Sequence, residues 1–514
     1  MHNQNSLLSI FKPAAFALLL SIGLSSCTKD DNPPIDNTPV VIKPDVVFFG
    51  VSATNQLIKY NAKTSTTAQA ILMVSGLQSG ENISAIDFRP ATGELYALGS
   101  TSRLYVINTT TGVARAVSAT PFTPAISGAA VGFDFNPTVD RIRVVTSTGQ
   151  NLRLNPETGT VAAVDGSING GAAPTVNSVA YSGNVSGSTA TVLYDIDVAS
   201  NKLFRQIPPN NGTLVEVGSL EITATGESGF DISPDGKTAL AALTVGGKQT
   251  LFQIDTASGK ATALGIFGAG DNITGIAIPT NPVAYAVDDM NNLLIFNHTK
   301  ADAPVSKAIT GLQAGENILG IDFRLVNGQL FALGSSSRLY ALNTSSGAAT
   351  MVGAGVFAPL LTGTSYGFDF NPTVDRIRVI GNNGQNLRMD PNTGLIAATD
   401  GILNPGTPNV SAAAYTTNYA GATQTALYVI DVTTDKLYLQ NPPNNGVLME
   451  VGALGINVET ANGFDIGSTT GIAYGIFTVG ATNGLYSINI GTGAATKLFD
   501  FPKNTRGFTV GLGF

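Results

Sequence analysis

The sequence has no tryptophan, a single cysteine and only two histidines among its 514 residues. A nucleophile activated by a positioned imidazole therefore lacks its base, and histidine-ligated zinc, copper or haem sites lack their ligands. His2 lies in the expected targeting segment, and His298 is expected to be a surface turn residue rather than a base. Without tryptophan, stacking against a sugar falls to the 14 tyrosines, whose strand positions favour packing instead.

Charged residues are also scarce, at 12% of the chain, and the net charge is −8 with a pI near 4.9. Binding to nucleic acid phosphates needs clustered Lys and Arg, and no basic run exists, so a nucleic acid partner is not expected. Apolar residues make up 43% of the chain, and the 58 glycines and 25 prolines supply many turns. This composition favours short strands over long helices.

The amino terminus carries an apolar stretch with the length of a signal-peptide core. Residues 13–24 (PAAFALLLSIGL) follow Lys12 and are too short to span a bilayer comfortably. The four residues LSSC that end at Cys27 resemble a bacterial lipobox, in which the cysteine is lipidated and becomes the first mature residue. The alternative is an ordinary signal peptide with an incidental thiol. We predict a lipoprotein signal peptide over residues 1–26.

A tether follows over residues 27–44, and its proline-rich part is expected to hold the globular region off the membrane. The residues TKDD at 28–31 resemble the Lys-acidic-acidic signal that sends Bacteroidota lipoproteins to the outer face of the outer membrane. The alternative is a solvated polar start to a linker. We therefore expect a lipid anchor in the outer membrane, with the protein facing the cell surface.

The rest of the chain is a duplication, with copies about 235 residues apart. Three motifs recur: GFDFNPTVDRIRV at 132–144 and 367–379, GQNLR at 149–153 and 384–388, and PPNNG at 208–212 and 442–446. We predict two repeat units, which span residues 45–279 and 283–514.

A shorter period lies inside each unit. Short hydrophobic-X-hydrophobic strands recur about every 47 residues, which is close to the length of a four-stranded propeller blade. Their central residues are Asp87, Asp134, Ala180, Asp231, Ala277, Asp322, Asp369, Ala414, Asp465 and Thr509. Turns such as 108–112 follow, in which Asn or Asp bonds its own backbone and Gly supplies a positive φ. The sequence predicts an all-β fold of ten four-stranded, blade-like modules.

Two closed arrangements fit ten blades. Each unit can close as a five-bladed propeller, with residues 276–278 completing the first, or all ten blades can form one ring. Residues 46–74 lack a first strand, whereas 507–512 form a first strand with nothing after it. Joining such ends removes exposed sheet edges. The short connection over 278–283 resembles a hairpin within one blade, which favours the single ring.

The repeated motifs, with GENI at 80–83, resemble an uncharacterised bacterial family, a domain of unknown function found in secreted and surface proteins. The resemblance covers both units. In that family a single unit can make up a whole protein, which implies that one unit can close alone. The resemblance therefore favours two tandem five-bladed propellers over one ten-bladed ring, and it implies no activity.

Asp, Arg and Asn recur together in a chain that is otherwise poor in charge. The Asp, Arg and Asn residues of one unit alternate along neighbouring strands. They are therefore expected to share a face of the sheet and form one polar cluster. The candidate ligand-binding residues are Asp87, Arg89, Arg103, Asp134, Arg141, Arg143, Asn151, Arg153, Asp322, Arg324, Arg338, Asp369, Arg376, Arg378, Asn386 and Arg388. They either join blades through buried hydrogen bonds and ion pairs, or line an axial pocket for an anionic or carbohydrate ligand.

These observations predict a non-catalytic binding or scaffold module for a protein or glycan partner. The alternative is a metal-assisted hydrolase or lactonase-like enzyme with carboxylates on the propeller axis, and a purely structural surface component is a third class. An enzyme needs its carboxylates open to solvent at one end of the channel, so burial and pairing of Asp87, Asp134 and Asp231 would argue against it.

No cofactor is expected. Calcium is the weak exception, because the segments 231–236 (DISPDG) and 288–292 (DDMNN) carry oxygen ligands. Neither segment has the spacing of a recognised calcium loop, and ordinary turns explain both.

Overall fold

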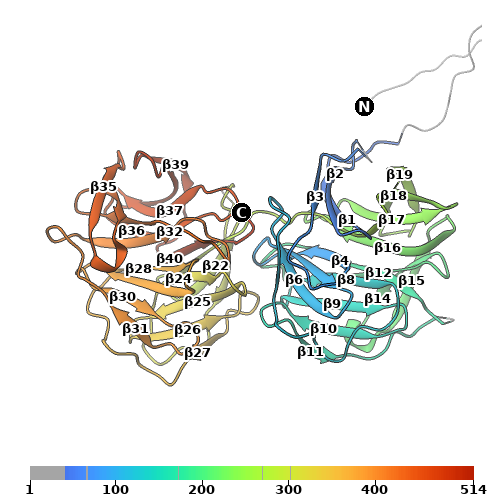
Figure 1. Cartoon of the computed structure of the whole chain (residues 1–514), viewed down its shortest axis with the longest axis horizontal. Helices are drawn as coiled ribbons and strands as arrows, with labels where there is room; N and C mark the ends of the chain where they lie inside the picture. The colour runs from blue at the N-terminus through green and yellow to red at the C-terminus, as the bar shows by residue number, and fades with distance from the viewer. Residues whose placement is uncertain (1–40, 65–66, 172, 269, 301) are drawn as a thin grey trace, which may run out of the picture. The chain divides into compact units, whose positions relative to one another are not determined.

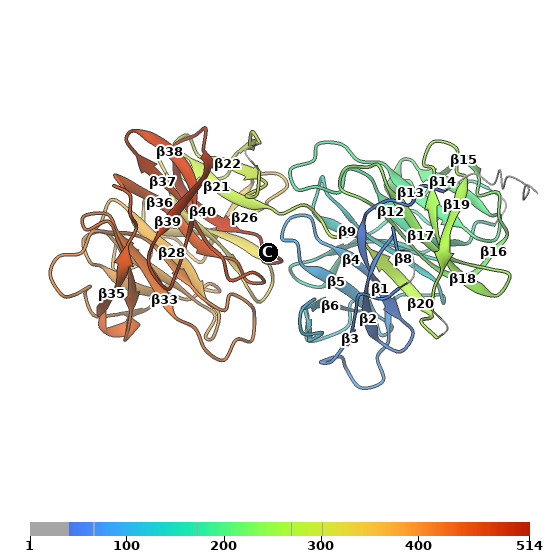
Figure 2. The same cartoon turned by 90° about the horizontal axis from the view of Figure 1, so that it is seen from above.

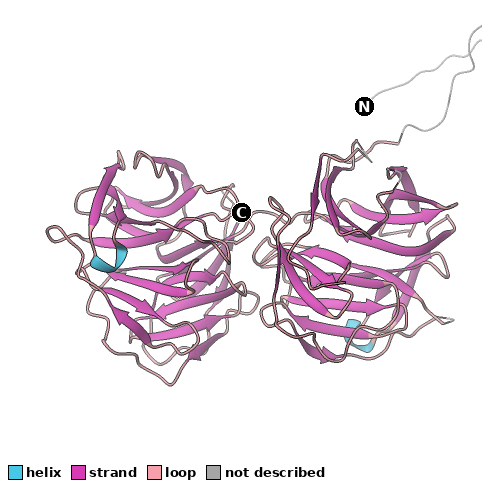
Figure 3. Ribbon diagram, viewed as in Figure 1, coloured by secondary structure: helices cyan, strands magenta, loops and turns pink. Residues whose placement is uncertain are grey.

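The computed structural model describes residues 41–64, 67–171, 173–268, 270–300 and 302–514. Cys27, the expected signal peptide and most of the expected tether lie outside these residues. The described chain is built of strands, with two short 3-10 helices at Pro209–Asn211 and Pro443–Asn445 (Figure 3). None of its helices has the length and apolar character needed to cross a membrane.

The first repeat forms five four-stranded antiparallel sheets, and the second repeat forms five more. The strands of the first repeat are β1 (Val47–Ser52), β2 (Gln56–Asn61), β3 (Ala70–Met73), β4 (Ile83–Phe88), β5 (Leu95–Gly99), β6 (Arg103–Ile107), β7 (Ala114–Ala116), β8 (Val131–Asn136), β9 (Arg141–Thr146), β10 (Asn151–Asn155), β11 (Thr160–Val164), β12 (Val176–Tyr181), β13 (Leu193–Asp197), β14 (Lys202–Gln206), β15 (Leu214–Ser219), β16 (Ala224–Ile232), β17 (Ala239–Val245), β18 (Lys248–Ile254), β19 (Ala261–Ile266) and β20 (Ile273–Ala277).

The strands of the second repeat are β21 (Ala284–Asp288), β22 (Asn292–Phe296), β23 (Val305–Ala308), β24 (Ile318–Arg324), β25 (Gln329–Gly334), β26 (Arg338–Leu342), β27 (Ala349–Val352), β28 (Tyr366–Asn371), β29 (Arg376–Gly381), β30 (Asn386–Met389), β31 (Ile396–Thr399), β32 (Val410–Tyr415), β33 (Leu427–Asp431), β34 (Lys436–Gln440), β35 (Leu448–Ala453), β36 (Thr460–Ile466), β37 (Ala473–Val479), β38 (Thr482–Ile488), β39 (Ala495–Asp500) and β40 (Thr505–Val510).

Each repeat closes on itself. β20 pairs with β1 to complete the first sheet (Figure 2), and β40 pairs with β21 in the same way. The innermost strands of the first repeat contact one another in the cyclic order β20, β4, β8, β12 and β16, and those of the second in the order β40, β24, β28, β32 and β36. The predicted all-β fold of ten four-stranded blades is therefore confirmed, as two five-bladed propellers (Figure 1). The single ten-bladed ring is excluded.

The connection between Ile278 and Val283 is not a hairpin, and this prediction was wrong. β20 and β21 belong to different sheets. The connection contains Pro279 and Pro282, which lack the N–H groups that a hairpin ladder needs. The segment instead leads from one propeller to the next.

The ten predicted centres all lie on the innermost strands of their sheets, where small residues allow a close approach. A Cβ atom on Gly132 would lie 2.8 Å from the backbone nitrogen of Val179, and one on Gly229 would lie 2.6 Å from that of Ile276. Apolar side chains fill the space between neighbouring sheets, as in the edge-to-face pair of Tyr96 with Phe135 at 5.2 Å. This packing removes apolar surface from water and stabilises each ring.

Candidate functional site

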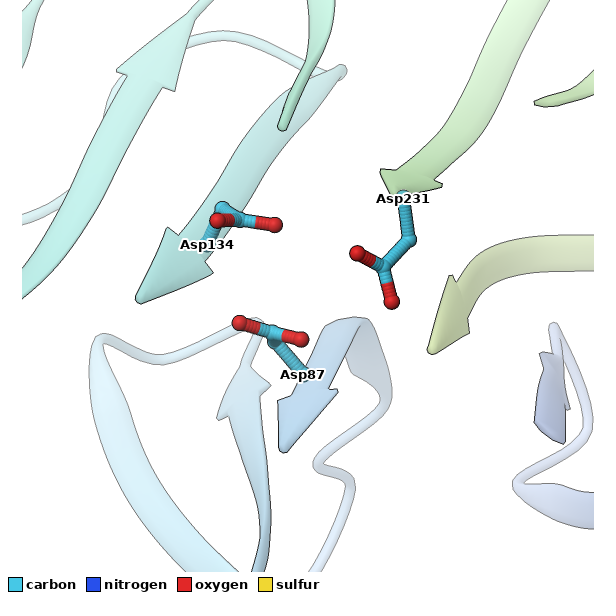
Figure 4. A group of neighbouring side chains, drawn as sticks. All are labelled: Asp87, Asp134 and Asp231. Atoms are coloured by element: carbon cyan, nitrogen blue, oxygen red, sulfur yellow. The ribbon is translucent and has the colours of Figure 1, made fainter. Parts of the chain in front are cut away.

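Three carboxylates converge at the centre of each propeller. Asp87 on β4, Asp134 on β8 and Asp231 on β16 point toward one another, with oxygen atoms within 4.8 Å (Figure 4). We call these three residues the first axial cluster. Asp322, Asp369 and Asp465 form the second axial cluster in the same way. All six side chains are buried, and those of the first cluster are each 1% exposed.

Each axial carboxylate also joins its own blade to the next one. The donor is a backbone N–H on the innermost strand of the following blade, one residue after the central residue of that strand. In the first cluster Phe135 donates to Asp87 at 2.7 Å, Tyr181 to Asp134 at 2.9 Å and Ile278 to Asp231 at 2.5 Å. In the second cluster the donors are Phe370, Tyr415 and Val510. Because each of these hydrogen bonds runs from the carboxyl group of one blade to a backbone group of the next, the clusters hold neighbouring blades together.

Burial raises the pKa of every carboxyl group in the two clusters. Desolvation is the main cause, and the neighbouring carboxylates raise the pKa values of Asp87 and Asp134 further, well above the ordinary range. The pKa of Asp231 is raised to about 7, and that of Asp465 to about 6. Three negative charges so close together in a dry site repel one another. The clusters therefore need protons or a cation near neutral pH.

The two clusters differ in the residue that completes the ring. Thr509 on β40 places its hydroxyl 2.9 Å from Asp322 Oδ1 and 2.9 Å from Asp465 Oδ2. Ala277 holds the same register position on β20 in the first propeller and has no hydroxyl. The first cluster therefore lacks the bridge that the second one has.

A buried asparagine marks a second difference. Asn418 donates through Nδ2 to Asp465 Oδ1 at 3.3 Å, and its Oδ1 has no partner among the described residues. Asn184, its counterpart in the first repeat, is fully buried, but neither amide atom has a partner among the described residues. Asp134 Oδ2 is likewise buried and without a partner there. The first axial cluster thus contains unsatisfied polar atoms, which folded proteins seldom leave in their interior.

A second buried polar group surrounds Arg143, which is 2% exposed. Its guanidinium donates to Tyr181 Oη at 3.3 Å, Asn151 Oδ1 at 2.7 Å, Asp165 Oδ2 at 2.6 Å and Asn210 Oδ1 at 2.8 Å. The three repeated motifs therefore meet at one guanidinium. Arg378 repeats the arrangement in the second propeller with Tyr415, Asn386, Asp400 and Asn444.

The predicted single polar cluster is thus divided, and this prediction was wrong. Asp134 and Arg143 are register partners on β8 and β9, but Asp134 bonds the next blade at the axis. The long side chain of Arg143 instead reaches the loop residues Asp165 and Asn210. Because a strand pattern gives neither the reach of a side chain nor the position of a distant loop, the sequence could not separate the two groups.

The remaining candidate residues lie at other positions. Arg89, with no exposed surface, forms a two-pronged pair with Asp140 at 2.9 and 2.5 Å, and Arg324 pairs with Asp375 in the same way. The other contacts are Arg153 to Asp165, Arg388 to Asp400, Arg141 to the Asp140 carbonyl, Arg376 to the Asp375 carbonyl and to Asp390, Arg103 to Thr101, and Arg338 to Ser336 and Glu316. A role of these residues in ligand binding stays a prediction.

The turn after β8 is capped by Asn136, whose Oδ1 accepts the Thr138 N–H at 2.9 Å, while the Asp140 carboxylate is occupied by Arg89. One local prediction was wrong. His298 is buried rather than at the surface, with its ring centre 5.0 Å from that of Tyr474. Burial lowers the pKa of His298 to about 4.

Four acids that accept several hydrogen bonds through largely buried side chains were not among the predicted site residues. Asp165 and Asp400 hold the Arg143 and Arg378 groups, and their signal was an Asp-Gly pair that recurs with the repeat. Glu81 accepts the Thr101 N–H at 2.9 Å and the Tyr105 hydroxyl at 2.8 Å. Glu316 has equivalent partners in the second propeller. Glu81 belongs to the GENI motif, which supported the resemblance to a known family but was not predicted to hold a site residue.

A hollow of about 400 Å³ opens on the first propeller where β4, β8 and β20 begin. Its polar lining consists of Asn82, Ser84, Ser100 and Thr274, its other lining residues are small or apolar, and none of them is titratable. We call it the neutral hollow.

The second propeller carries larger side chains at two of the corresponding positions. Tyr366 replaces Val131 at the start of β28, and Arg506 replaces Thr274 on β40. Arg506 donates to the Asp288 carbonyl at 3.1 Å. The two propellers therefore present different surfaces at this end.

Comparison with known proteins identifies a family in both repeats. The profile of a domain of unknown function (DUF4394) matches residues 56–277 and again residues 292–510. No curated protein matches the chain.

Solved structures resemble the chain only distantly. The extracellular domain of BT4673 from B. thetaiotaomicron is 13% identical, with a TM-score of 0.25 over 89% of this chain and 59% of that one. PorZ, a surface component of the type-IX secretion system of Porphyromonas gingivalis, is 12% identical, with a TM-score of 0.27 over 87% of this chain and 66% of that one. The chain spans less than two thirds of either structure, and neither likeness carries an argument about function.

Proposed function

The chain belongs to the DUF4394 family, in two copies as its repeated motifs predicted, and on that premise we propose that it is a non-catalytic binding module for a glycan. The neutral hollow of the first propeller is the observation that carries the proposal. Its hydroxyl and amide groups can both donate and accept hydrogen bonds, as sugar hydroxyls require. Because its lining has no titratable side chain, it suits an uncharged ligand.

The arginines that were candidates for an anionic ligand are already occupied. Arg143 and Arg153 both bind Asp165, and Arg378 and Arg388 both bind Asp400. Arg143 and Arg378 are buried, and releasing either one would leave a largely buried carboxylate without its inner partner, which is strongly unfavourable. This favours an uncharged glycan over an anion.

The alternative of a hydrolase or lactonase-like enzyme is disfavoured by burial of the axial carboxylates. They converge as an enzyme would require, but Asp87, Asp134 and Asp231 are each 1% exposed. General acid or base catalysis needs the carboxyl group within hydrogen-bond reach of the substrate or of one bridging water. The neutral hollow has no residue that could take over this role.

The proposed location is the cell surface, through a lipid on Cys27. This part of the proposal is supported by the apolar stretch at 13–24, by the lipobox-like LSSC and by the polar tether. A tethered binding module at this location can meet extracellular glycans.

The experiment is a glycan array screened with the purified full chain, followed by calorimetry on the glycans that bind. Replacing Val131 by tyrosine and Thr274 by arginine copies the second propeller, and it should weaken binding by at least about tenfold. Arg506→Thr is the matched control and should leave the affinity unchanged. Absence of glycan binding, capture of a protein partner alone, or full affinity in the doubly substituted chain would contradict the proposal.

A further inference from the structure

The first axial cluster contains a buried carboxylate oxygen, Asp134 Oδ2, that has no partner among the described residues, and we propose that the cluster binds one calcium ion. The ligands are Asp87, Asp134 and Asp231 from three blades and the side-chain oxygen of Asn184. The second axial cluster, in which the Thr509 hydroxyl bridges two of the carboxylates, binds none.

The spacing of the carboxylates fits calcium. The three ligand oxygens lie within 4.8 Å of one another. Calcium takes oxygen ligands at about 2.4 Å in a flexible geometry, so carboxylates from three blades can hold it. Magnesium demands a near-ideal octahedron at about 2.1 Å and usually keeps several waters, which suits a dry site less well. An all-oxygen ligand set also favours a hard cation over zinc or copper.

An unpartnered amide points to a ligand independently of the carboxylates. Asn184 is fully buried, and neither its Oδ1 nor its Nδ2 has a partner among the described residues. Its counterpart Asn418 reaches Asp465 Oδ1, the equivalent of an Asp231 oxygen. Asn184 holds the corresponding sequence position in the first repeat. Calcium would satisfy Asn184 Oδ1 together with the free Asp134 Oδ2.

The second axial cluster shows what the protein does without an ion. The Thr509 hydroxyl lies between Asp322 and Asp465, at 2.9 Å from each, and Asn418 is bonded to Asp465. In the first cluster Ala277 leaves the position of that hydroxyl open. A divalent ion there would reduce the charge of three carboxylates from −3 to −1, and backbone N–H groups already face the carboxylates.

The test begins with the full chain, stripped with EGTA and then dialysed against radioactive calcium. We expect one ion per chain, and a melting temperature that rises with calcium chloride and much less with magnesium chloride, because a ligand that binds only the folded state stabilises it. Asp369→Asn in the second cluster is the matched control and should leave one ion bound.

Two substitutions test the ligands directly. Ala277→Thr copies Thr509 into the first propeller and should weaken calcium binding by at least about tenfold, with an unchanged circular dichroism spectrum. Asn184→Ala should also weaken calcium binding. If Ala277→Thr does not fold, the calcium affinity of Asn184→Ala tests the proposal instead. No calcium bound at millimolar concentration, two ions per unmodified chain, or unchanged affinity in the folded variants would overturn the proposal.

Discussion

Replacing Asp195 by valine is expected to stabilise the first propeller. Asp195 lies on β13 with no exposed surface, and neither carboxylate oxygen has a partner among the described residues. Desolvation raises its pKa well above the ordinary value, and the charge of Arg143 opposes this shift only in part. The second propeller has Val429 in the same position, opposite Ala413 as Asp195 is opposite Val179. Valine is therefore already accepted at this position of the fold.

The size of the gain follows from the missing hydrogen bonds. A buried polar group without a partner costs about 1–3 kcal/mol, and the lost attraction to Arg143 offsets part of what valine restores. We expect a net gain of about 2 kcal/mol near pH 7. Because the pKa of Asp195 is raised on folding, the folded chain holds a proton that the unfolded chain releases above its ordinary pKa of 3.8. The stabilisation by valine should therefore grow as the pH rises above about 4.

The assay is urea unfolding of the full chain at several pH values between 4 and 7, followed by tyrosine fluorescence because the chain has no tryptophan. Val429→Asp is the matched reverse substitution, and it should destabilise the second propeller by a similar amount with the same pH dependence. A valine variant that is less stable than the unmodified chain, or a gain that does not change with pH, would refute the reasoning.

Three further predictions concern other residues. Burial lowers the pKa of His298 to about 4, so the side chain takes up a proton when the protein unfolds between pH 4 and 6.5. Its contribution of about 3 kcal/mol to the free energy of unfolding is present above pH 6.5 and is lost as the pH falls toward 4. His298→Phe should remove this pH dependence from the free energy of unfolding measured in urea, and the same dependence on pH in both chains would contradict the prediction. Arg378→Gln leaves the carboxylate of Asp400 without its inner guanidinium and should destabilise the folded protein by about 3–5 kcal/mol. The side chain of Arg388 is 32% exposed, so Arg388→Gln should destabilise it by less than about 1 kcal/mol. Similar losses of stability in both variants, measured by calorimetry, would contradict this contrast. Cys27→Ser should move the chain from the membrane to the soluble fraction of cells, and persistent membrane association would argue against a lipid on this residue.

The blade pattern was predictable because it depends on local chemistry. Asn108 Oδ1 accepts the N–H groups of Thr110 and Thr111, and Gly112 has a φ of +75°, as the turn pattern predicts. Strand alternation and turn residues act over a few positions, so the ten innermost strands could be located from sequence. The predicted hairpin after β20 was wrong because the prediction used the short length of the connection and not its prolines at 279 and 282.

The sites were predictable only as sets of residues. Arg143, Asn151 and Asp134 were selected because charged and amide side chains recur in a chain with little charge. Arg143 and Asn151 do meet, but Asp134 bonds the next blade instead, and Arg143 bonds Asn210, which lies 67 residues further along the chain. Asp195 corresponds to a valine in the other repeat and therefore gave no repeated signal.

The number of blades, the duplication and the residue types available for chemistry could be read from the sequence, because periodicity and composition are properties of the chain alone. The separate closure of each repeat and the meeting of particular carboxylates follow from the three-dimensional fold. Asp87 and Asp231 lie far apart in the sequence, and they converge because five innermost strands close into a ring around one axis. The same closure buries them, so their charge must be balanced inside the protein rather than by water.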